Sequence, residues 1–258
     1  MAYQLTLLAM LGLVVGRFMG LVSLRLPRGE DFAVPSSHYS ECPSKPKPWQ
    51  SIPLISYLVA RGKCPRCAAP IPVRYPLIET ASALIGLWAA LHSPNLLGAL
   101  MTALLGWNLL LIAVVDGEHF WIPDVLTVPL FISGLIAAVV LSPLGIREAL
   151  PYALVSPLIG AAFGFGSLWL LALLYQRIRR REGLGGGDPI LFGAIGAWTG
   201  LIGLPSVLLY ASLSALGMAL VRGLIRKKLS GTDALPFGVF LAIGAWLTYL
   251  YGPLDVFG

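Results

Sequence analysis

The chain has 258 residues, of which 57% are hydrophobic and only 12% are charged, and its mean hydropathy is +0.81. A soluble domain carries about 25% charged residues, so this composition excludes an ordinary soluble protein and predicts a membrane protein. The net charge of +6 could suit nucleic acid or anionic lipid. However, the basic residues stand beside apolar segments without an aromatic-rich soluble module, which argues against nucleic-acid binding and leaves membrane lipid as the expected surrounding.

Eight apolar segments follow one another along the chain, and each predicts an α-helix in a membrane. They cover residues 5–24, 77–91, 97–115, 125–141, 153–175, 189–203, 205–221 and 235–250. A crossing takes about 20 apolar residues, so eight crossings are expected, although the shorter segments could be re-entrant or buried helices. The runs are continuous, whereas barrel strands would alternate apolar and polar residues. We therefore expect an all-α polytopic membrane protein.

The basic residues predict which side of the membrane each loop faces. Of the 18 lysines and arginines, 16 lie in the loops after the first, fifth and seventh segments. The two exceptions are Arg17 and Arg147. Such a bias marks cytoplasmic loops, so both termini are expected outside. The first segment has neither a basic start nor a small-residue cleavage site, so we expect a retained helix rather than a cleaved signal peptide.

Residues 25–76 form the one polar stretch long enough to fold outside the membrane. The expected organisation is a first transmembrane helix at 1–24, a cytoplasmic loop domain at 25–76 and a transmembrane domain at 77–258. The loop domain holds all three cysteines of the chain, Cys42, Cys64 and Cys67. A zinc ion bound by them could supply folding energy to so small a domain.

A closed zinc site needs four ligands, and Lys45 stands where a partner of Cys42 would be expected in a second CxxC pair. His38 or Glu41 could complete the set. Reduced thiols without metal are the alternative, and a disulfide is less favoured because the cytoplasm is reducing.

Two aspartates stand at ends of expected helices on the cytoplasmic side. Asp116 ends the segment 97–115, and Asp188 follows a run of three glycines and opens the segment 189–203. An ionisable group at the membrane suggests a function, because its burial is costly. The glycines allow close backbone approach. The structural alternatives are an N-cap role for Asp188 and a solvated helix end for Asp116.

Two carboxylates held close together share a proton, because both cannot ionise easily. Such a pair can activate a water molecule and protonate a leaving amide nitrogen. Asp124, which follows Pro123, could compete for this role, but an N-cap of the next helix is the simpler expectation. The sequence has no G-x-S-x-G, H-E-x-x-H or Walker A motif, so an aspartyl peptidase is the favoured chemistry.

These motifs resemble the type IV prepilin peptidases, bacterial members of the GxGD membrane aspartyl proteases. The similar segments are Gly185-Gly-Gly-Asp188 (GxGD), the stretch from Asp116 to Pro123-Asp124, Arg74-Tyr-Pro-Leu-Ile-Glu79 (RYPxxE), Ile52-Pro-Leu-Ile-Ser-Tyr57 and Pro236-Phe-Gly238. The resemblance runs almost end to end in the same order. It implies that Asp116 and Asp188 are the catalytic pair, supported by Gly185, Gly187, Asp124 and Glu79.

The resemblance also implies a substrate and a place in the cell. Members cleave the short basic leader of prepilins and type II secretion pseudopilins after a glycine, just before an apolar helix that docks laterally. They do so in the bacterial inner membrane, with the active site facing the cytoplasm. Proteolysis then needs no cofactor, whereas many members also methylate the new N-terminus with S-adenosylmethionine.

Three segments depart from the family's pattern: in the loop domain Lys45 replaces a cysteine, in the first helix Arg17 and Gly20 replace a small polar residue and an asparagine, and after the GxGD motif Ile190 replaces a lysine. The first two fall in the region associated with methylation and metal binding. Glu79 either serves methylation or caps the second segment. Two other functions stay open: a degenerate paralogue that binds pilin-like substrates without cutting them, and a membrane transporter that uses paired carboxylates.

Overall fold

The computed structural model describes residues 2–30, 53–63, 70–142, 152–180, 183–226 and 235–254. Within these ranges the chain is helical apart from short connections and one isolated bridge between Lys63 and Pro70. The possible zinc ligands Cys42, Cys64, Cys67 and His38 lie outside these ranges, so the zinc site stays a prediction. The chain divides into two compact units, Met1–Trp107 and Asn108–Gly258.

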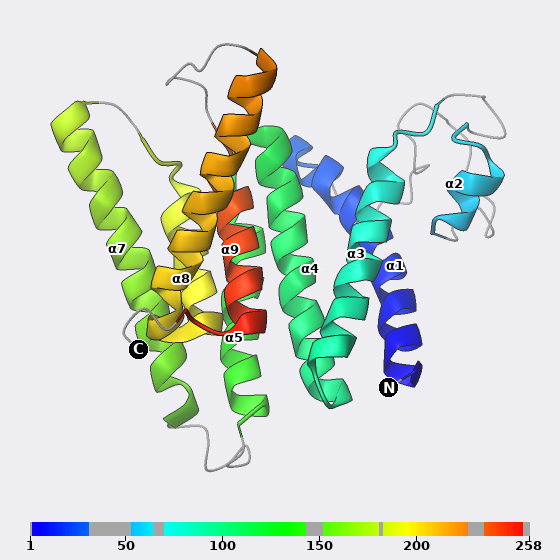
Figure 1. Cartoon of the computed structure of the whole chain (residues 1–258), viewed down its shortest axis with the longest axis horizontal. Coiled ribbons are helices and arrows are strands. Elements are labelled where there is room, and N and C mark those ends of the chain that lie inside the picture. The colour runs from blue at the N-terminus through cyan, green and yellow to red at the C-terminus, as the bar shows by residue number, and fades with distance from the viewer. Residues whose placement is uncertain are drawn as a thin grey trace. The chain divides into compact units, whose positions relative to one another are not determined.

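The first unit is built on the pairing of two long helices. It contains α1 (Ala2–Arg25), the short turn η1 (Leu26–Arg28), α2 (Ile55–Val59), α3 (Arg74–His92) and the first part of α4 (Leu96–His119). Helices α1 and α3 pack side by side (Figure 1). A β-carbon on Gly16 of α1 would lie 2.7 Å from the Cα of Glu79 in α3, so the two backbones are nearly in contact. Small residues permit such close packing of membrane helices.

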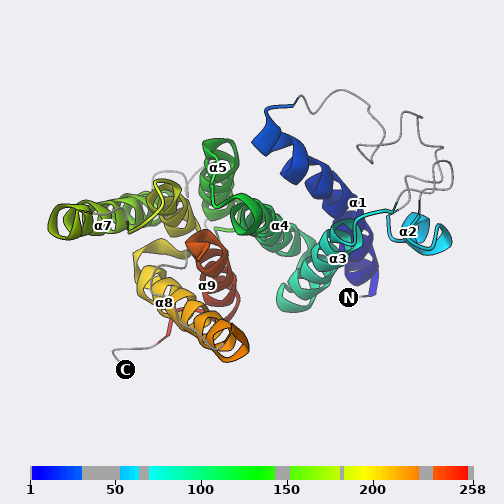
Figure 2. The same cartoon turned by 90° about the horizontal axis from the view of Figure 1, so that it is seen from above.

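The second unit is arranged around α8 (Gly187–Arg226). This helix packs against α5 (Asp124–Val140), α7 (Val155–Arg179) and α9 (Phe237–Tyr251), as Figures 1 and 2 show. Gly193 and Gly196 of α8 lie against α7, where small residues permit close packing. The Trp198 indole N–H also donates to the carbonyl of Leu130 in α5 at 2.8 Å. Leu191 and Phe192, in the first turns of α8, are fully buried and belong to the core of this unit.

Helix α8 is broken in the middle by Gly200. Its φ of 66° and ψ of −179° fall in a region that is open essentially to glycine alone. In Figure 1 the yellow part of α8 descends and the orange part ascends. Helix α8 thus consists of a first leg, residues 187–199, and a second leg, residues 201–226. The expectation of two separate helical segments is therefore confirmed. The sequence placed their boundary near Pro205, which instead lies inside the second leg.

Among the described residues, four helices are long and apolar enough to cross a membrane: Ala2–Arg28, Leu96–His119, Val155–Arg179 and Asp188–Ile225. Helices α5 and α9 are shorter and also apolar. Large apolar side chains such as Leu170 and Leu171 of α7 are more than half exposed, as expected of a surface that faces lipid. The all-α polytopic membrane fold is therefore confirmed, while eight separate crossings remain a prediction.

Replacing Gly200 by alanine tests the break. A β-carbon there would be strained at the positive φ and would lie 3.0 Å from the Ser156 hydroxyl oxygen. We expect Gly200→Ala to lower the free energy of unfolding by about 1–3 kcal/mol, seen as a lower thermal midpoint in detergent. Gly217→Ala, in the second leg of α8, is the control, because its β-carbon meets no atom within 4 Å. Equal midpoints for both variants would contradict this account.

Candidate active site

Asp116 lies in the last turn of α4 and is almost completely buried, with 4% of its surface exposed. Its Oδ2 atom accepts a hydrogen bond of 3.1 Å from the backbone N–H of Val239, and the N–H of Gly238 also faces this carboxylate. Both N–H groups belong to the first turn of α9, where helical N–H groups lack a partner within the helix. The start of α9 is therefore a ready-made site for a carboxylate.

Gly238 allows α9 to begin this close to Asp116. A β-carbon at this position would lie 2.8 Å from the Asp116 Oδ2 and 2.6 Å from the Ile122 Cδ1. Any larger residue would therefore push α9 away from the carboxylate. The sequence pattern marked Pro236-Phe-Gly238 without giving a reason for it, and this contact supplies one.

Asp188 is equally buried, with 5% of its surface exposed, and lies in the first turn of α8. Its Oδ2 accepts a hydrogen bond of 2.9 Å from the N–H of Gly185, and its own N–H donates to the Gly185 carbonyl at 3.2 Å. The two residues thus close a tight turn. The alternative of an N-cap is wrong, because α8 begins before Asp188 and the carboxylate points back to the glycine turn.

The three glycines of this turn are not equivalent. A β-carbon on Gly185 would lie 3.2 Å from the Asp188 Oδ2, and one on Gly187 would lie 2.8 Å from the Ile122 Cβ. A β-carbon on Gly186 would meet no atom within 4 Å. The spacing G-x-G-D therefore follows from two close contacts on either side of an open position.

The structure brings the two predicted aspartates together. Asp116 and Asp188 lie close enough for their charges to interact. The buried Ile122, which follows α4, lies against both Gly187 and Gly238 and so packs between the segments that hold the two carboxylates. Sequence analysis missed Ile122, because an isoleucine in an apolar chain gives no signal of its own.

Asp124 differs from the pair in its exposure. It is the first residue of α5 and is exposed to solvent, whereas Pro123 occupies the N-cap position and no side-chain cap bond is formed. The expected N-cap role of Asp124 is therefore wrong by one position. A carboxylate in the first turn still interacts favourably with the helix dipole.

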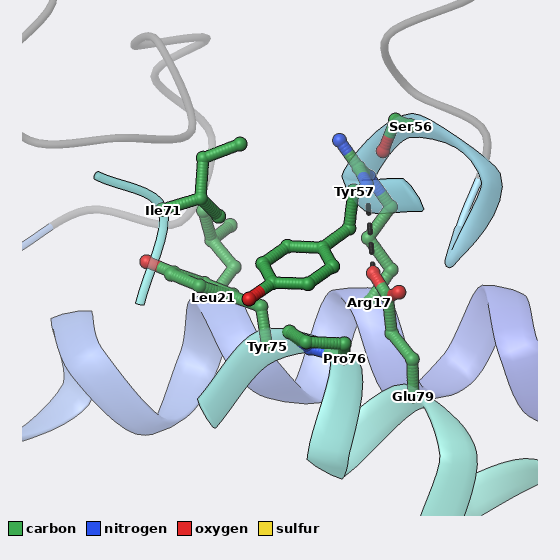
Figure 3. A pocket seen from close by; sticks show the side chains of 8 residues that line it. All are labelled: Arg17, Leu21, Ser56, Tyr57, Ile71, Tyr75, Pro76 and Glu79. Carbon is green, nitrogen blue, oxygen red and sulfur yellow. Dashed lines mark hydrogen bonds and ion pairs between the residues drawn. The ribbon is translucent and has the colours of Figure 1, made fainter. Parts of the chain in front are cut away.

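Glu79 lies in the first unit and has a different setting. It is buried, and its Oε1 atom pairs with the Arg17 guanidinium at 3.5 Å, as Figure 3 shows. Its Oε2 accepts a hydrogen bond of 2.7 Å from the N–H of Leu54. The alternative that Glu79 caps this helix is wrong, because α3 already begins at Arg74 with Val73 as N-cap. Arg17, a departure from the family's pattern, is therefore a partner for this acid.

The hydrogen bond from the Leu54 N–H to Glu79 connects the segment before α2 to helix α3. Leu54 has a positive φ of 55°, which is uncommon for a residue with a branched side chain, and directly precedes α2. Glu79 thus joins α1 through Arg17 and α2 through Leu54. The small pocket around it, also lined by Tyr57 and Tyr75, has room for about one water molecule.

Removing Glu79 should loosen this segment. Glu79→Ala deletes the acceptor of the Leu54 N–H and the charge beside Arg17, and a hydrogen bond to a charged group is worth about 1.5–3 kcal/mol. We expect amide hydrogen exchange in residues 55–60 to become about 10-fold faster or more, and Glu79→Gln to have a smaller effect.

The control is Glu30→Ala. Glu30 pairs with Arg28 at 3.9 Å, but both side chains are more than half exposed, so this pair should contribute little. If exchange in residues 55–60 were as slow in Glu79→Ala as in Glu30→Ala, the proposed tie would not exist.

Comparisons with known proteins agree with the geometry. Residues 10–93 match the model of the bacterial peptidase A24 N-terminal domain, and residues 103–220 match that of the type IV leader peptidase family. No solved structure gives a significant match. A prepilin leader peptidase/N-methyltransferase of Pseudomonas aeruginosa is 37% identical, over 94% of this chain and 89% of its own length.

Two further relatives point the same way. A type 4 prepilin-like proteins leader peptide-processing enzyme of Escherichia coli is 36% identical, over 92% of this chain and 90% of its own length. A prepilin leader peptidase/N-methyltransferase of Dichelobacter nodosus is 33% identical, over 93% and 89% respectively. Full-length similarity at this identity shows that the chain belongs to the type IV leader peptidase family, and it is an aspartic-type peptidase of the membrane.

Proposed function

We propose that Asp116 and Asp188 are the catalytic pair of a peptidase that removes the leader from type IV prepilins or type II secretion pseudopilins. The observation that supports this most is the burial of both carboxylates at neighbouring helix ends, each held by a backbone N–H group. The names of the relatives supply the substrate class.

The pair can carry out peptide hydrolysis with the atoms it has. One carboxyl group is ionised and the other is protonated, because two neighbouring charges repel each other. The ionised group takes a proton from a water molecule while the water oxygen bonds to the carbonyl carbon of the scissile peptide. The protonated group gives its proton to the carbonyl oxygen.

The second half of the reaction breaks the C–N bond. The carboxyl group that took the water's proton passes it to the leaving nitrogen as the tetrahedral intermediate collapses. At the same time the other carboxylate takes back a proton from a hydroxyl group of the intermediate, so the leader leaves with a new carboxyl group, the mature protein leaves with a free amine, and the pair regains its starting state. Backbone N–H groups of Val239 and Gly185 hold the two carboxylates, and no ion pair joins either one to a basic side chain of the described residues, which leaves both available for proton transfer.

The site is proposed to face the cytoplasm from the bacterial inner membrane. Within the second unit, α7 ends with Arg177 and Arg179 shortly before Asp188 in the chain, and basic residues beside membrane helices favour the cytoplasmic side. A basic leader would enter the site from that side, while the apolar helix behind it stays in the membrane.

Proteolysis of this type needs no cofactor. Methylation would need S-adenosylmethionine, and among the described residues the pocket beside Glu79 has room for about one water molecule. The proposal therefore covers proteolysis, and methylation is left to measurement. Zinc at Cys42, Cys64 and Cys67 remains a separate proposal about residues outside the described ranges.

Asparagine substitutions test the catalytic pair. Asp116→Asn and Asp188→Asn keep the shape of each side chain but remove its acid–base function, which typically contributes about 10²–10⁴-fold to a rate. We expect each variant to lose prepilin cleavage by at least about 100-fold, read by mass spectrometry with purified protein in lipid. Gain of one methyl group on the wild-type product would add the methyltransferase activity.

Asp124→Asn is the matched control, because Asp124 is exposed and should leave cleavage unchanged. Wild-type cleavage by either pair variant would refute the assignment of the dyad. Binding of prepilins without cleavage by the wild type would favour the degenerate paralogue instead.

The glycine contacts give a sharper test of the geometry. Gly187→Ala and Gly238→Ala should lower cleavage by about tenfold or more, because displacement of catalytic groups by about 1 Å can cost this much or more. Gly186→Ala should retain cleavage, since its β-carbon meets no atom within 4 Å. Cleavage rates of the three variants, compared at equal folded protein, check this order. Equal loss in all three would mean that the turn needs glycine for another reason.

A further inference from the structure

The glycine turn that precedes Asp188 is closed on itself. The Gly185 N–H donates to the Asp188 Oδ2 at 2.9 Å, and the Asp188 N–H donates to the Gly185 carbonyl at 3.2 Å. These two bonds fix the carboxylate relative to the turn, but they do not fix the turn relative to the rest of the second unit. The orientation of the Asp188 carboxylate therefore depends on the contacts that hold the turn from outside.

Two such contacts lie on opposite sides of Gly185 in the chain. After it, Gly187 lies against Ile122. Before it, Gly183 lies against the aromatic ring of Tyr175 in α7, because a β-carbon on Gly183 would lie 2.5 Å from the Tyr175 Cδ1 and 3.1 Å from its Cζ. The ring thus occupies the space that a side chain at residue 183 would need. It supports the chain two residues before the N–H group that holds Asp188.

The path of the chain after α7 explains why Gly183 meets this ring. Helix α7 ends at Arg179, and Arg180 follows in the left-handed region with a φ of 52°, its N–H donating to the Gln176 carbonyl at 2.9 Å. Tyr175 precedes Arg180 by about 7.5 Å of helix, at about 1.5 Å per residue. The chain therefore turns back along α7 before α8 begins (Figure 1), and Gly183 passes the ring on this return.

A tyrosine is well suited to this support. Its ring is large and rigid and has only two side-chain torsions, so a firm contact costs little conformational entropy. The atoms nearest to Gly183 are ring carbons, whereas the hydroxyl group is not among them. Tyr175 is 44% exposed near the end of a membrane helix, where an aromatic ring can pack on the protein while its hydroxyl group reaches water.

We propose that Tyr175 is a positioning residue of the peptidase reaction, which holds the glycine turn so that Asp188 keeps its orientation relative to Asp116. It acts through Gly183 and Gly185 and does not touch the substrate. The inference rests on the proposed function, because it assigns a support to one acid of the catalytic pair. Gly183 then has a steric role of its own, although it stands before the G-x-G-D spacing.

Removal of the ring tests this role. In Tyr175→Ala the turn loses its support on the α7 side, so we expect kcat for prepilin cleavage to fall about tenfold, because misplaced catalytic groups slow the chemical step. KM should stay within about twofold, since substrate binding does not involve the ring. Tyr175→Phe keeps the contacting carbons and should cleave like the wild type.

Ile178→Ala is the matched control. Ile178 lies one turn further along α7 and is 69% exposed, so its truncation should change neither kcat nor KM. All variants are compared at equal amounts of folded protein, which separates a loss of orientation from a loss of stability.

A second variant tests whether Tyr175 acts through Gly183. Gly183→Ala places a β-carbon where the ring lies and should lower kcat about as much as Tyr175→Ala. The double variant should fall no more than about twofold below either single variant, because both changes remove the same contact and effects at contacting residues are not additive. Losses that multiply to about 100-fold would mean that the two residues act independently, which would contradict the inference.

The outcomes separate this inference from the proposed function. If the wild type cleaves prepilin and Tyr175→Ala does so with the same kcat, the positioning role is wrong while the proposed function stands. An equal loss in Tyr175→Phe would assign the effect to the hydroxyl group and would also overturn the inference. A wild type that cleaves no prepilin overturns the proposed function, and the positioning role with it. A lower kcat at constant KM, restored by phenylalanine and not additive with Gly183→Ala, supports both.

Discussion

A buried carboxylate must be paired with donors, and this requirement shapes the second unit. Asp116 accepts from the first turn of α9, and Asp188 accepts from the glycine turn that opens α8. Neutral backbone donors orient these acids without supplying an opposite charge. Glu79 in the first unit instead pairs with the Arg17 cation and holds Leu54, a setting that suits a structural tie. Backbone partners thus distinguish the two acids that are proposed to react from Glu79, whose partners include a cation.

The glycines give these donors access to the acids. Gly238 lets α9 approach Asp116, and Gly187 lets the turn approach Ile122. The buried Ile122 side chain lies against both glycines and so keeps a fixed spacing between the start of α9 and the glycine turn, because protein interiors are close-packed. The chemistry thus depends on an isoleucine and two glycines as well as on the aspartates.

The sequence predicted the helices well because apolar runs separated by polar residues are a strong signal in a membrane chain. It also placed Asp116 and Asp188 at helix ends on one side of the membrane, from helix direction and the basic residues, but it could not show how far apart they lie. It could not predict the N–H groups that hold them, because backbone donors leave no trace in residue type. Asp124 and Glu79 were given wrong capping roles, as helix starts shift by a residue or two and tertiary partners are invisible in one sequence. Arg17 appeared only as a departure from the family's pattern until its contact with Glu79 was seen.

The reversal at Gly200 also determines the side on which the chain emerges from α8 and on which α9 can begin. The first leg of α8 leads away from Asp188, yet the N–H groups of α9 must reach Asp116, which lies beside Asp188. The second leg supplies the return path (Figure 1). A chain that lost one leg would deliver the start of α9 to the opposite membrane face and leave Asp116 without its donors. Losing or gaining a single leg between Asp188 and Gly238 would therefore separate the α9 donors from Asp116, whereas an even change would keep them on the same side.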